Sequence, residues 1–291
     1  MEQALEFLAG AQNHDGSWGY QTGGAGFTEP TAIGLMAMVG SHAAATRAAV
    51  AWLLKGQHAD GGWGAFGSDA ESGWQSSVAV WGLSAAQKAG APGGLAAAVG
   101  RGTGWLLANR SRSLPLPNPA TRLEGSLAGW PWTPGTFGWV IPTGLALLAL
   151  KEAGAGSAAE QAASQAAGLL DDRRCAGGGW NWGNPVLFGT HLPPYATETA
   201  LGVLGLLAAG RHQGSTEVRE GLDWLEGNLD PDTGVTATAW GVLALRAGGR
   251  ATADAVERLR RLQAPDGSWR GSPHATALAH LASSGPPGPR S

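Results

Sequence analysis

The chain has 291 residues, a formal net charge of −3 and only 14% charged residues, which excludes the basic surface that nucleic-acid binding requires. A single cysteine, Cys175, excludes a disulfide framework and a cysteine-rich metal site. The first residues lack the basic segment of a signal peptide, and no apolar run reaches the ~18 residues of a membrane span. We therefore expect a soluble, cytoplasmic protein.

A short phrase repeats along the chain. Residues 12–18 read QNHDGSW, residues 57–63 read QHADGGW, and residues 263–269 read QAPDGSW. Each copy closes an apolar helical stretch, and such a repeat indicates an array of similar helical units. Asp-Gly supplies a turn, and the glutamine side chain can satisfy backbone groups at a helix end. We expect the repeat to fasten one helix pair to the next, with its tryptophans in structural roles.

Six units follow in chain order, each made of two helices. The first helices are amphipathic and are expected over residues 3–12, 43–57, 95–109, 158–170, 217–228 and 251–263. The second helices are apolar nearly all round and are expected over residues 31–39, 76–89, 141–153, 197–209, 236–247 and 274–282. A helix that is apolar on every side is buried. The pattern therefore predicts two concentric layers, with the second helices inside.

Six helix pairs are the number that closes an α/α toroid, and closure removes the need for the polar end caps of an open solenoid. We predict an all-α fold, a single (α/α)6 toroid or barrel over residues 1–283. The Pro/Gly-rich end, residues 284–291, is predicted to be a disordered tail.

The Q-x-x-D-G-S-W repeat resembles the QW motif of the squalene–hopene and oxidosqualene cyclases, and related repeats build the β subunits of protein prenyltransferases. The chain is similar to this superfamily over residues 3–282. The resemblance implies an isoprenoid-handling enzyme, either a class II terpene cyclase-like isomerase or a prenyltransferase-like protein. Such an enzyme would bind an apolar polyprenyl substrate in a central, aromatic-lined pocket. For a long isoprenoid, we expect this pocket to open toward a membrane surface.

Cyclases of this family carry Asp-x-Asp-Asp-Thr-Ala at the start of an inner helix, and the middle aspartate protonates the substrate. This chain has no D-x-D-D, and the corresponding stretches read FTEPTA at residues 27–32 and YATETA at residues 195–200. Glu29 stands where that aspartate would be in the first, and Thr197 does in the second, with Glu198 beside it. Both glutamates shortly precede a Thr-Ala pair that opens an apolar helix. They are either groups that complement a helix N-terminus or desolvated general acids with a raised pKa.

Two glycine-rich loops with many aromatic residues lead into the third and fourth inner helices and should lie at one rim of the toroid. Aromatic faces suit an isoprenoid chain or a carbocation, and equally sugar stacking or rim packing. Two further tryptophans stand midway along the second and fifth inner helices, where a ring either fills the toroid centre or lines a cavity. The candidate substrate-binding residues are Trp81, Trp130, Trp132, Phe137, Trp139, Trp180, Trp182, Tyr195 and Trp240.

These motifs require no cofactor. The resemblance to protein prenyltransferases implies an alternative with zinc, in which His191 or His274 would complete a set with Asp171, Asp172 and Cys175, and a partner subunit would be needed. Magnesium is a further alternative. A lone cysteine is more often a small buried hydrophobe than a metal ligand.

Two other functions stay open. The first is a non-catalytic binding or assembly module that has lost the cyclase acid, which the missing D-x-D-D and the missing second toroid favour. The second is a carbohydrate-active α/α toroid, which needs two carboxylates facing one groove and which the repeated motif argues against. The toroidal thioester domain of complement-like proteins lacks support because its Cys-Gly-Glu-Gln signature is absent.

Overall fold

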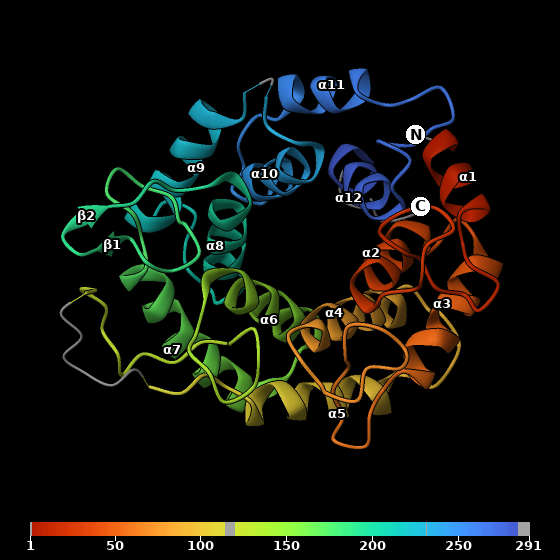
Figure 1. Ribbon diagram of the computed structural model, residues 1–291, viewed down its shortest axis with the longest axis horizontal. Helices are drawn as coiled ribbons and strands as arrows, with labels where there is room; N and C mark the ends of the chain where they lie inside the picture. Colours follow the sequence, from red (N-terminus) through yellow and green to blue (C-terminus); the bar gives the residue numbers. More distant parts are fainter. Residues whose placement is uncertain (1, 114–119, 231, 285–291) are drawn as a thin grey trace.

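The computed structural model describes residues 2–113, 120–230 and 232–284 and shows an all-α toroid of two concentric rings (Figure 1). The inner helices are α2 (Thr28–Met38), α4 (Gln75–Lys88), α6 (Val140–Ala153), α8 (Ala196–Ala208), α10 (Val235–Ala247) and α12 (Pro273–Ser284). The outer helices are α1 (Glu2–Gly10), α3 (Ala43–Lys55), α5 (Leu95–Ala108), α7 (Gly156–Asp172), α9 (Thr216–Asn228) and α11 (Ala253–Arg261). The predicted fold class and the placement of the second helices inside are confirmed.

The inner ring closes on itself. Each inner helix packs against its two inner neighbours, and α12 packs against α2 to complete the circle. Each outer helix lies over two consecutive inner helices, so that α1 contacts both α12 and α2. In this ring α2 lies opposite α8, and α4 lies opposite α10 (Figure 1).

The structure differs from the predicted elements at a few boundaries. Helix α2 begins at Thr28, three residues earlier than expected, and the buried Thr28 hydroxyl donates a 2.7 Å hydrogen bond to the Gly64 carbonyl. A small hairpin, β1 (Val186–Leu187) and β2 (Thr190–His191), was not expected. Ser284, the first residue of the predicted tail, ends α12, and the rest of that tail lies outside the described residues. None of the described helices is long and apolar enough to cross a bilayer.

One tryptophan per unit ties the outer helix to the following inner helix in five of the six units. Its indole N–H donates to a leucine carbonyl near the end of the outer helix at 2.6–2.8 Å. Its backbone N–H donates at 2.8–3.0 Å to a hydroxyl near the start of the inner helix. The five are at most 2% exposed: Trp18, Trp63, Trp130, Trp180 and Trp269.

The glutamine and glycine of the motif join neighbouring units, as predicted. Gln12 donates through Nε2 to the Gly16 carbonyl at 2.9 Å and to the Ala45 carbonyl of α3 at 3.0 Å. The turn glycine has a positive φ and lies against the next outer helix; a Cβ at Gly267 would collide with the Gln3 carbonyl of α1. The turn after α11 therefore sits on α1, which closes the outer ring.

The hydroxyls that accept from the five tryptophans also set a common register for the inner helices. They belong to Thr31, Ser76, Thr143, Thr199 and Thr276. The residue two positions earlier is partly exposed in every case, and we name these five the mouth ring: Glu29, Trp74, Ile141, Thr197 and His274.

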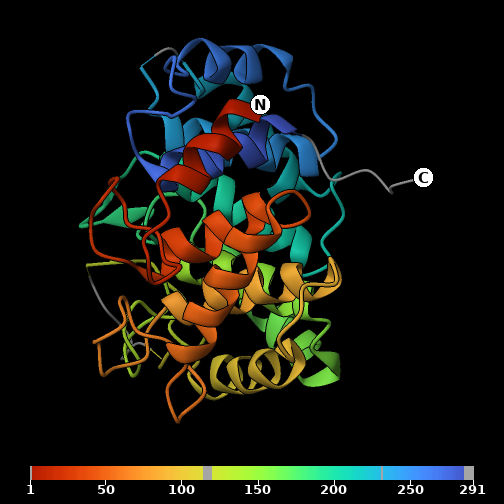
Figure 2. The same cartoon turned by 90° about the vertical axis from the view of Figure 1, so that its right-hand side faces the viewer.

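Partial exposure returns two helical turns further along, as at Trp81 and Leu148, so this face of the inner helices points toward the toroid axis. The loops that precede the inner helices project from one face of the toroid, on the left in Figure 2. This face is the mouth of the toroid.

Candidate functional site at the toroid mouth

Two of the predicted substrate-binding residues belong to the toroid wall. Trp130 and Trp180 are the third- and fourth-unit counterparts of Trp18, with 2% and 0% of their surface exposed. Their indole N–H groups are bonded to Leu106 and Leu170 carbonyls at 2.8 and 2.6 Å. Because both ring and N–H are used in packing, these two tryptophans are not available to a substrate, and the expectation for them is corrected.

Trp81 and Trp240 meet in the middle of the toroid. They extend from the opposite inner helices α4 and α10, and their rings stack with centroids 6.0 Å apart and an interplanar angle of 27°. An indole is large enough that two of them span much of the space between facing helices. Two rings of the expected aromatic lining therefore pack against each other at this level.

Glu29 lies in a polar cluster that joins the first and last units. The Tyr20 hydroxyl donates a hydrogen bond to Oε2 of Glu29, and Nε2 of His274 lies 3.3 Å from Oε1. Burial alone would raise the pKa of Glu29, but His274 and the Tyr20 hydroxyl together lower it below its ordinary value. Glu29 is therefore biased toward the carboxylate form, which argues against the alternative in which desolvation raises its pKa.

The surroundings of Glu198 shift its carboxyl pKa in the opposite direction. Only 6% of the residue is exposed, and burial raises the pKa of its carboxyl against smaller opposing contributions from its own backbone N–H and the Trp182 side chain. Tyr195 precedes it by three residues, and the Tyr195 and Trp182 rings pack against each other with centroids 5.4 Å apart. Glu198 thus combines burial, a bias toward the protonated form and neighbouring aromatic rings.

The two glutamates do not occupy equivalent places in their units. Glu29 stands two residues before the register hydroxyl of Thr31, whereas Glu198 stands one residue before that of Thr199. One residue turns a helix by about 100°. Thr197 is therefore the counterpart of Glu29 in the mouth ring, and Glu198 lies to one side of it.

The remaining predicted aromatic residues gather at the mouth. Trp132 packs edge-on against Trp74 of the mouth ring at 5.2 Å, and Phe137 is 40% exposed. Trp139 caps the start of α6, where the Val140 N–H donates to the Trp182 carbonyl at 3.2 Å. Trp182 is itself 59% exposed. These rings form an arc over the third and fourth units.

The sequence-based set missed the arc's continuation over the first two units. Tyr20 packs against Phe27 at 5.1 Å, and Phe27 packs edge-on against Phe66 at 5.9 Å. Tyr20 and Phe27 bracket a glycine-rich loop that leads into an inner helix. The criterion that selected the loops of units three and four would have found them here.

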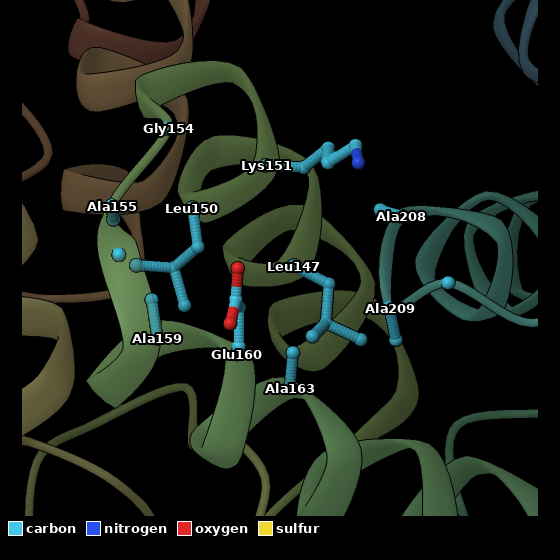
Figure 3. Close-up of a pocket in the computed structure, with 12 residues that line it drawn as sticks. Leu147, Leu150, Lys151, Gly154, Ala155, Ala159, Glu160, Ala163, Ala208 and Ala209 are labelled. Carbon is cyan, nitrogen blue, oxygen red and sulfur yellow. The ribbon is translucent and has the colours of Figure 1, made fainter.

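Several hollows of the described surface lie on the face away from the mouth. One of about 370 Å³ lies between the C-terminal ends of α6 and α8 and the start of α7. It is lined mainly by leucine and alanine side chains such as Leu147, Leu150 and Ala163, with Lys151 and Glu160 among its charged groups (Figure 3). Similar hollows lie between other units. Because they recur where successive helix pairs meet, they are a consequence of the repeated fold and do not mark one specific site.

The residues of the zinc alternative are engaged elsewhere. Asp171 pairs with Arg211, Asp172 pairs with Arg173, and Cys175 is buried. Among the described residues, no group of three or more His, Cys, Asp or Glu side chains is arranged to hold a metal ion. His274 contacts Glu29, so the residues of the zinc alternative are not brought together.

No family model matches the sequence, and no curated protein matches it either. Solved structures do match. The type II terpene cyclase MstE from Scytonema superposes with a TM-score of 0.66 at 18% identity, over 97% of this chain and 95% of that one. The ent-copalyl diphosphate synthase from Streptomyces platensis matches with a TM-score of 0.58 at 22% identity, over 84% of this chain and 46% of that one.

The alpha-2-macroglobulin of Escherichia coli also matches, with a TM-score of 0.56 at 14% identity, over 96% of this chain and 41% of that one. The chain therefore has the toroid fold of the type II terpene cyclases. The same toroid serves a different kind of protein in alpha-2-macroglobulin, so the function has to be argued from the mouth itself.

Proposed function

We propose that this protein is a class II terpene cyclase-like enzyme that binds a polyprenyl chain at the mouth and protonates one of its double bonds with Glu198. The observation that carries the proposal is the buried carboxyl of Glu198, biased toward its protonated form beside aromatic rings. A neutral carboxylic acid is the group that such a reaction needs, because the alkene must receive a proton in a site that excludes water.

The chemistry after protonation suits the surroundings of Glu198. Protonation of a terminal double bond creates a carbocation, which neighbouring double bonds can attack to close rings. Trp182 and Tyr195 lie beside the acid, and an aromatic face attracts a cation within about 6 Å of its centre. The exposed arc of aromatic rings offers an apolar surface on which the rest of the chain can fold.

The fold comparison supports this choice without deciding it. One matching structure is that of MstE with geranylgeranyl dihydroxybenzoate named as its substrate, at a TM-score of 0.65 and 15% identity over 97% of this chain. That protein shares the toroid and acts on a polyprenyl compound. The transfer of that substrate class to this chain rests on Glu198 and the aromatic arc.

The test is turnover by the purified protein. Squalene, farnesyl diphosphate and geranylgeranyl diphosphate would be incubated separately with the wild type and with Glu198→Gln, and products identified by mass spectrometry. Loss of a general acid should lower turnover by about 10²- to 10⁴-fold. Glu71→Gln, an exposed glutamate in the loop before α4, is the matched control and should keep full activity. Equal turnover in wild type and Glu198→Gln would refute the acid assignment.

A second candidate, a binding module without catalysis, is favoured by one specific observation. Glu29, at the position of the cyclase acid, is ionised by its partners, so the position implied by the resemblance does not supply a proton. The same experiment separates the two. Saturable binding of a polyprenyl diphosphate, measured by calorimetry, with no product from any substrate would favour the binding module.

A further inference from the structure

The loop that follows the wall tryptophan Trp180 presents one exposed ring from a buried backbone. Asn181, Gly183 and Pro185 are buried, whereas Trp182 between them is 59% exposed. A large side chain left in water adds little to stability. A loop that is fixed in place and yet presents such a ring therefore points to a task for the ring itself.

The side chain of Asn181 fixes this loop. It is 3% exposed, and its Oδ1 accepts from the backbone N–H groups of Gly183 and Asn184, both at 3.0 Å. Its Nδ2 donates to the Asn184 carbonyl at 3.0 Å. An asparagine side chain can make about four hydrogen bonds, so most of its capacity is used on the two residues that follow Trp182. These bonds span Trp182 and fix its backbone as a turn.

The neighbouring unit holds the same backbone from the other side. The carbonyl of Trp182 accepts from the N–H of Val140, the first residue of α6, at 3.2 Å. Gly183 follows with a φ of 135°, a conformation that side-chain-bearing residues rarely adopt. Trp182 is therefore held between Asn181 and the start of α6, and the direction of its side chain is set by the loop.

The ring held in this way reaches the proposed acid. It packs against Tyr195 with centroids 5.4 Å apart, and as a hydrogen-bond donor the Trp182 side chain lowers the pKa of the Glu198 carboxyl below what burial alone would give. The arrangement is particular to this unit. In the other four units with a wall tryptophan, the residue after it is Gly19, Gly64, Pro131 or Arg270.

We infer that Asn181 is a positioning residue of the proposed cyclisation, which holds the Trp182 ring against Glu198 and against the cation that protonation creates. This inference rests on the proposed function. Glu198 gives its proton to an alkene carbon, the π electrons become the new C–H bond, and the positive charge is left on the adjacent carbon. An indole that is already in place stabilises this charge as it forms, whereas a mobile ring has to be ordered first.

A double-mutant cycle tests the inference. Turnover of the substrate that the wild type converts would be measured for Asn181→Ala, Trp182→Ala and the double variant. Asn181→Ala should lower kcat by about 10-fold, the size of a cation–π contact sheltered from water, and change KM less. Because Asn181 acts through Trp182, adding Asn181→Ala to Trp182→Ala should lower kcat no further. Urea denaturation should show the same loss of stability from Asn181→Ala in both backgrounds.

Two further variants supply a rescue and a control. Asn181→Asp keeps an oxygen for the N–H groups of Gly183 and Asn184 and loses the donated bond, so it should retain more activity than Asn181→Ala. Asn228→Ala is the matched control, because Nδ2 of this exposed asparagine also donates to a backbone carbonyl, that of Trp224, at 2.7 Å. It should leave kcat unchanged. If Asn181→Ala failed to fold, Asn181→Asp measured in the same two backgrounds would decide.

The pH profile adds a measurement that a purely structural role would not move. The value of kcat/KM should fall as Glu198 loses its proton, and Asn181→Ala should move this fall to higher pH, because the carboxylate loses the Trp182 donor. Trp182→Phe should move it in the same direction. An unmoved fall in Asn181→Ala would contradict the positioning role.

The outcomes separate the inference from the proposed function. Unchanged turnover in Asn181→Ala, or an equal fall in both backgrounds, would overturn the role of Asn181 and leave Glu198 as the acid. A wild type with no turnover on any substrate would remove the proposed function, and the positioning role with it.

Discussion

The two sides of the mouth each place a glutamate at the start of an inner helix and surround it with opposite chemistry. On the side of the first and last units, a hydroxyl and an imidazole hold Glu29 as a carboxylate. On the side of the fourth unit, Glu198 is buried beside aromatic rings, and its pKa is raised. Two carboxyl groups whose surroundings push their pKa values apart are suited to different tasks.

The comparison also shows how a repeat can mislead. Both glutamates lie just before a Thr-Ala pair, yet the register hydroxyls place them about 100° apart around their helices. In a repeated fold, residues that recur at one register position, such as Trp18 and Trp180, perform the same structural task. A polar residue that stands outside such a repeated position, such as Glu198 beside the mouth ring, is a better candidate for function.

The largest expected loss of stability distinguishes two tryptophans of one loop, Trp180 in the toroid wall and Trp182 at the mouth. Trp180→Ala should lower the free energy of unfolding by about 3–5 kcal/mol, because it empties a fully buried site and frees the Leu170 carbonyl. Trp182→Ala, two residues away and 59% exposed, should change it by only about 0.5 kcal/mol. Urea denaturation followed by circular dichroism would measure both. Equal losses would mean that Trp182 belongs to the wall as well.

Replacing Glu29 or Glu198 by glutamine should change the free energy of unfolding at neutral pH in opposite directions. The folded pKa of Glu29 is lowered, so its carboxylate stabilises the fold above the ordinary glutamate pKa, and this stability is lost as the pH falls through the folded pKa. Glu29→Gln should therefore lose about 1–3 kcal/mol at neutral pH and approach the wild type in acid. Thermal unfolding from about pH 2 to about pH 8 gives the comparison, because the convergence is expected below the ordinary glutamate pKa.

For Glu198 the folded pKa is raised, so its contribution is fully present below the ordinary glutamate pKa and is lost as the pH rises through the folded pKa. Glu198→Gln should therefore be more stable than the wild type at neutral pH, by about 1.4 kcal/mol for each unit by which the pKa is raised. The difference should vanish in acid. A Glu198→Gln variant less stable than the wild type at neutral pH would contradict the raised pKa.

The smallest effect concerns the hydroxyl that holds Glu29. Tyr20→Phe keeps the ring contacts with Phe27 and His274 and removes one hydrogen bond to a carboxylate. Stability at neutral pH should fall by about 0.5–1 kcal/mol, because water can replace the hydroxyl at this exposed edge. Calorimetry beside Glu29→Gln would measure it. A loss larger than that of Glu29→Gln would show that the hydroxyl acts through another partner.

The fold could be predicted from sequence because its determinants are local and repeated. The motif at residues 12–18 contains the turn, the glutamine that reaches the next unit and the tryptophan that reaches the preceding helix. Helix amphipathicity then assigned the layers, since a helix that is apolar all round must be inside.

The mouth was predicted only in part, because its chemistry depends on contacts between distant units. Glu29 meets His274 across the ring closure, and no local pattern indicates that pairing. The sequence places Trp81 and Trp240 midway along their inner helices, but only the geometry of facing helices shows that their rings stack. Trp130 and Trp180 were misassigned because long loops hid their register with Trp18.

Ring closure also sets the order in which the mouth is assembled. The Ser272 hydroxyl donates to the Tyr20 carbonyl at 2.6 Å across 252 residues of sequence, and Thr22 bonds to Gly271 nearby at 3.0 Å. Units of a repeat fold can form by stacking on the unit before them as synthesis proceeds. Because His274 lies in α12, Glu29 cannot meet its imidazole until α12 has been synthesised and has packed against α2. A chain without α12 would therefore lack the contact that lowers the pKa of Glu29.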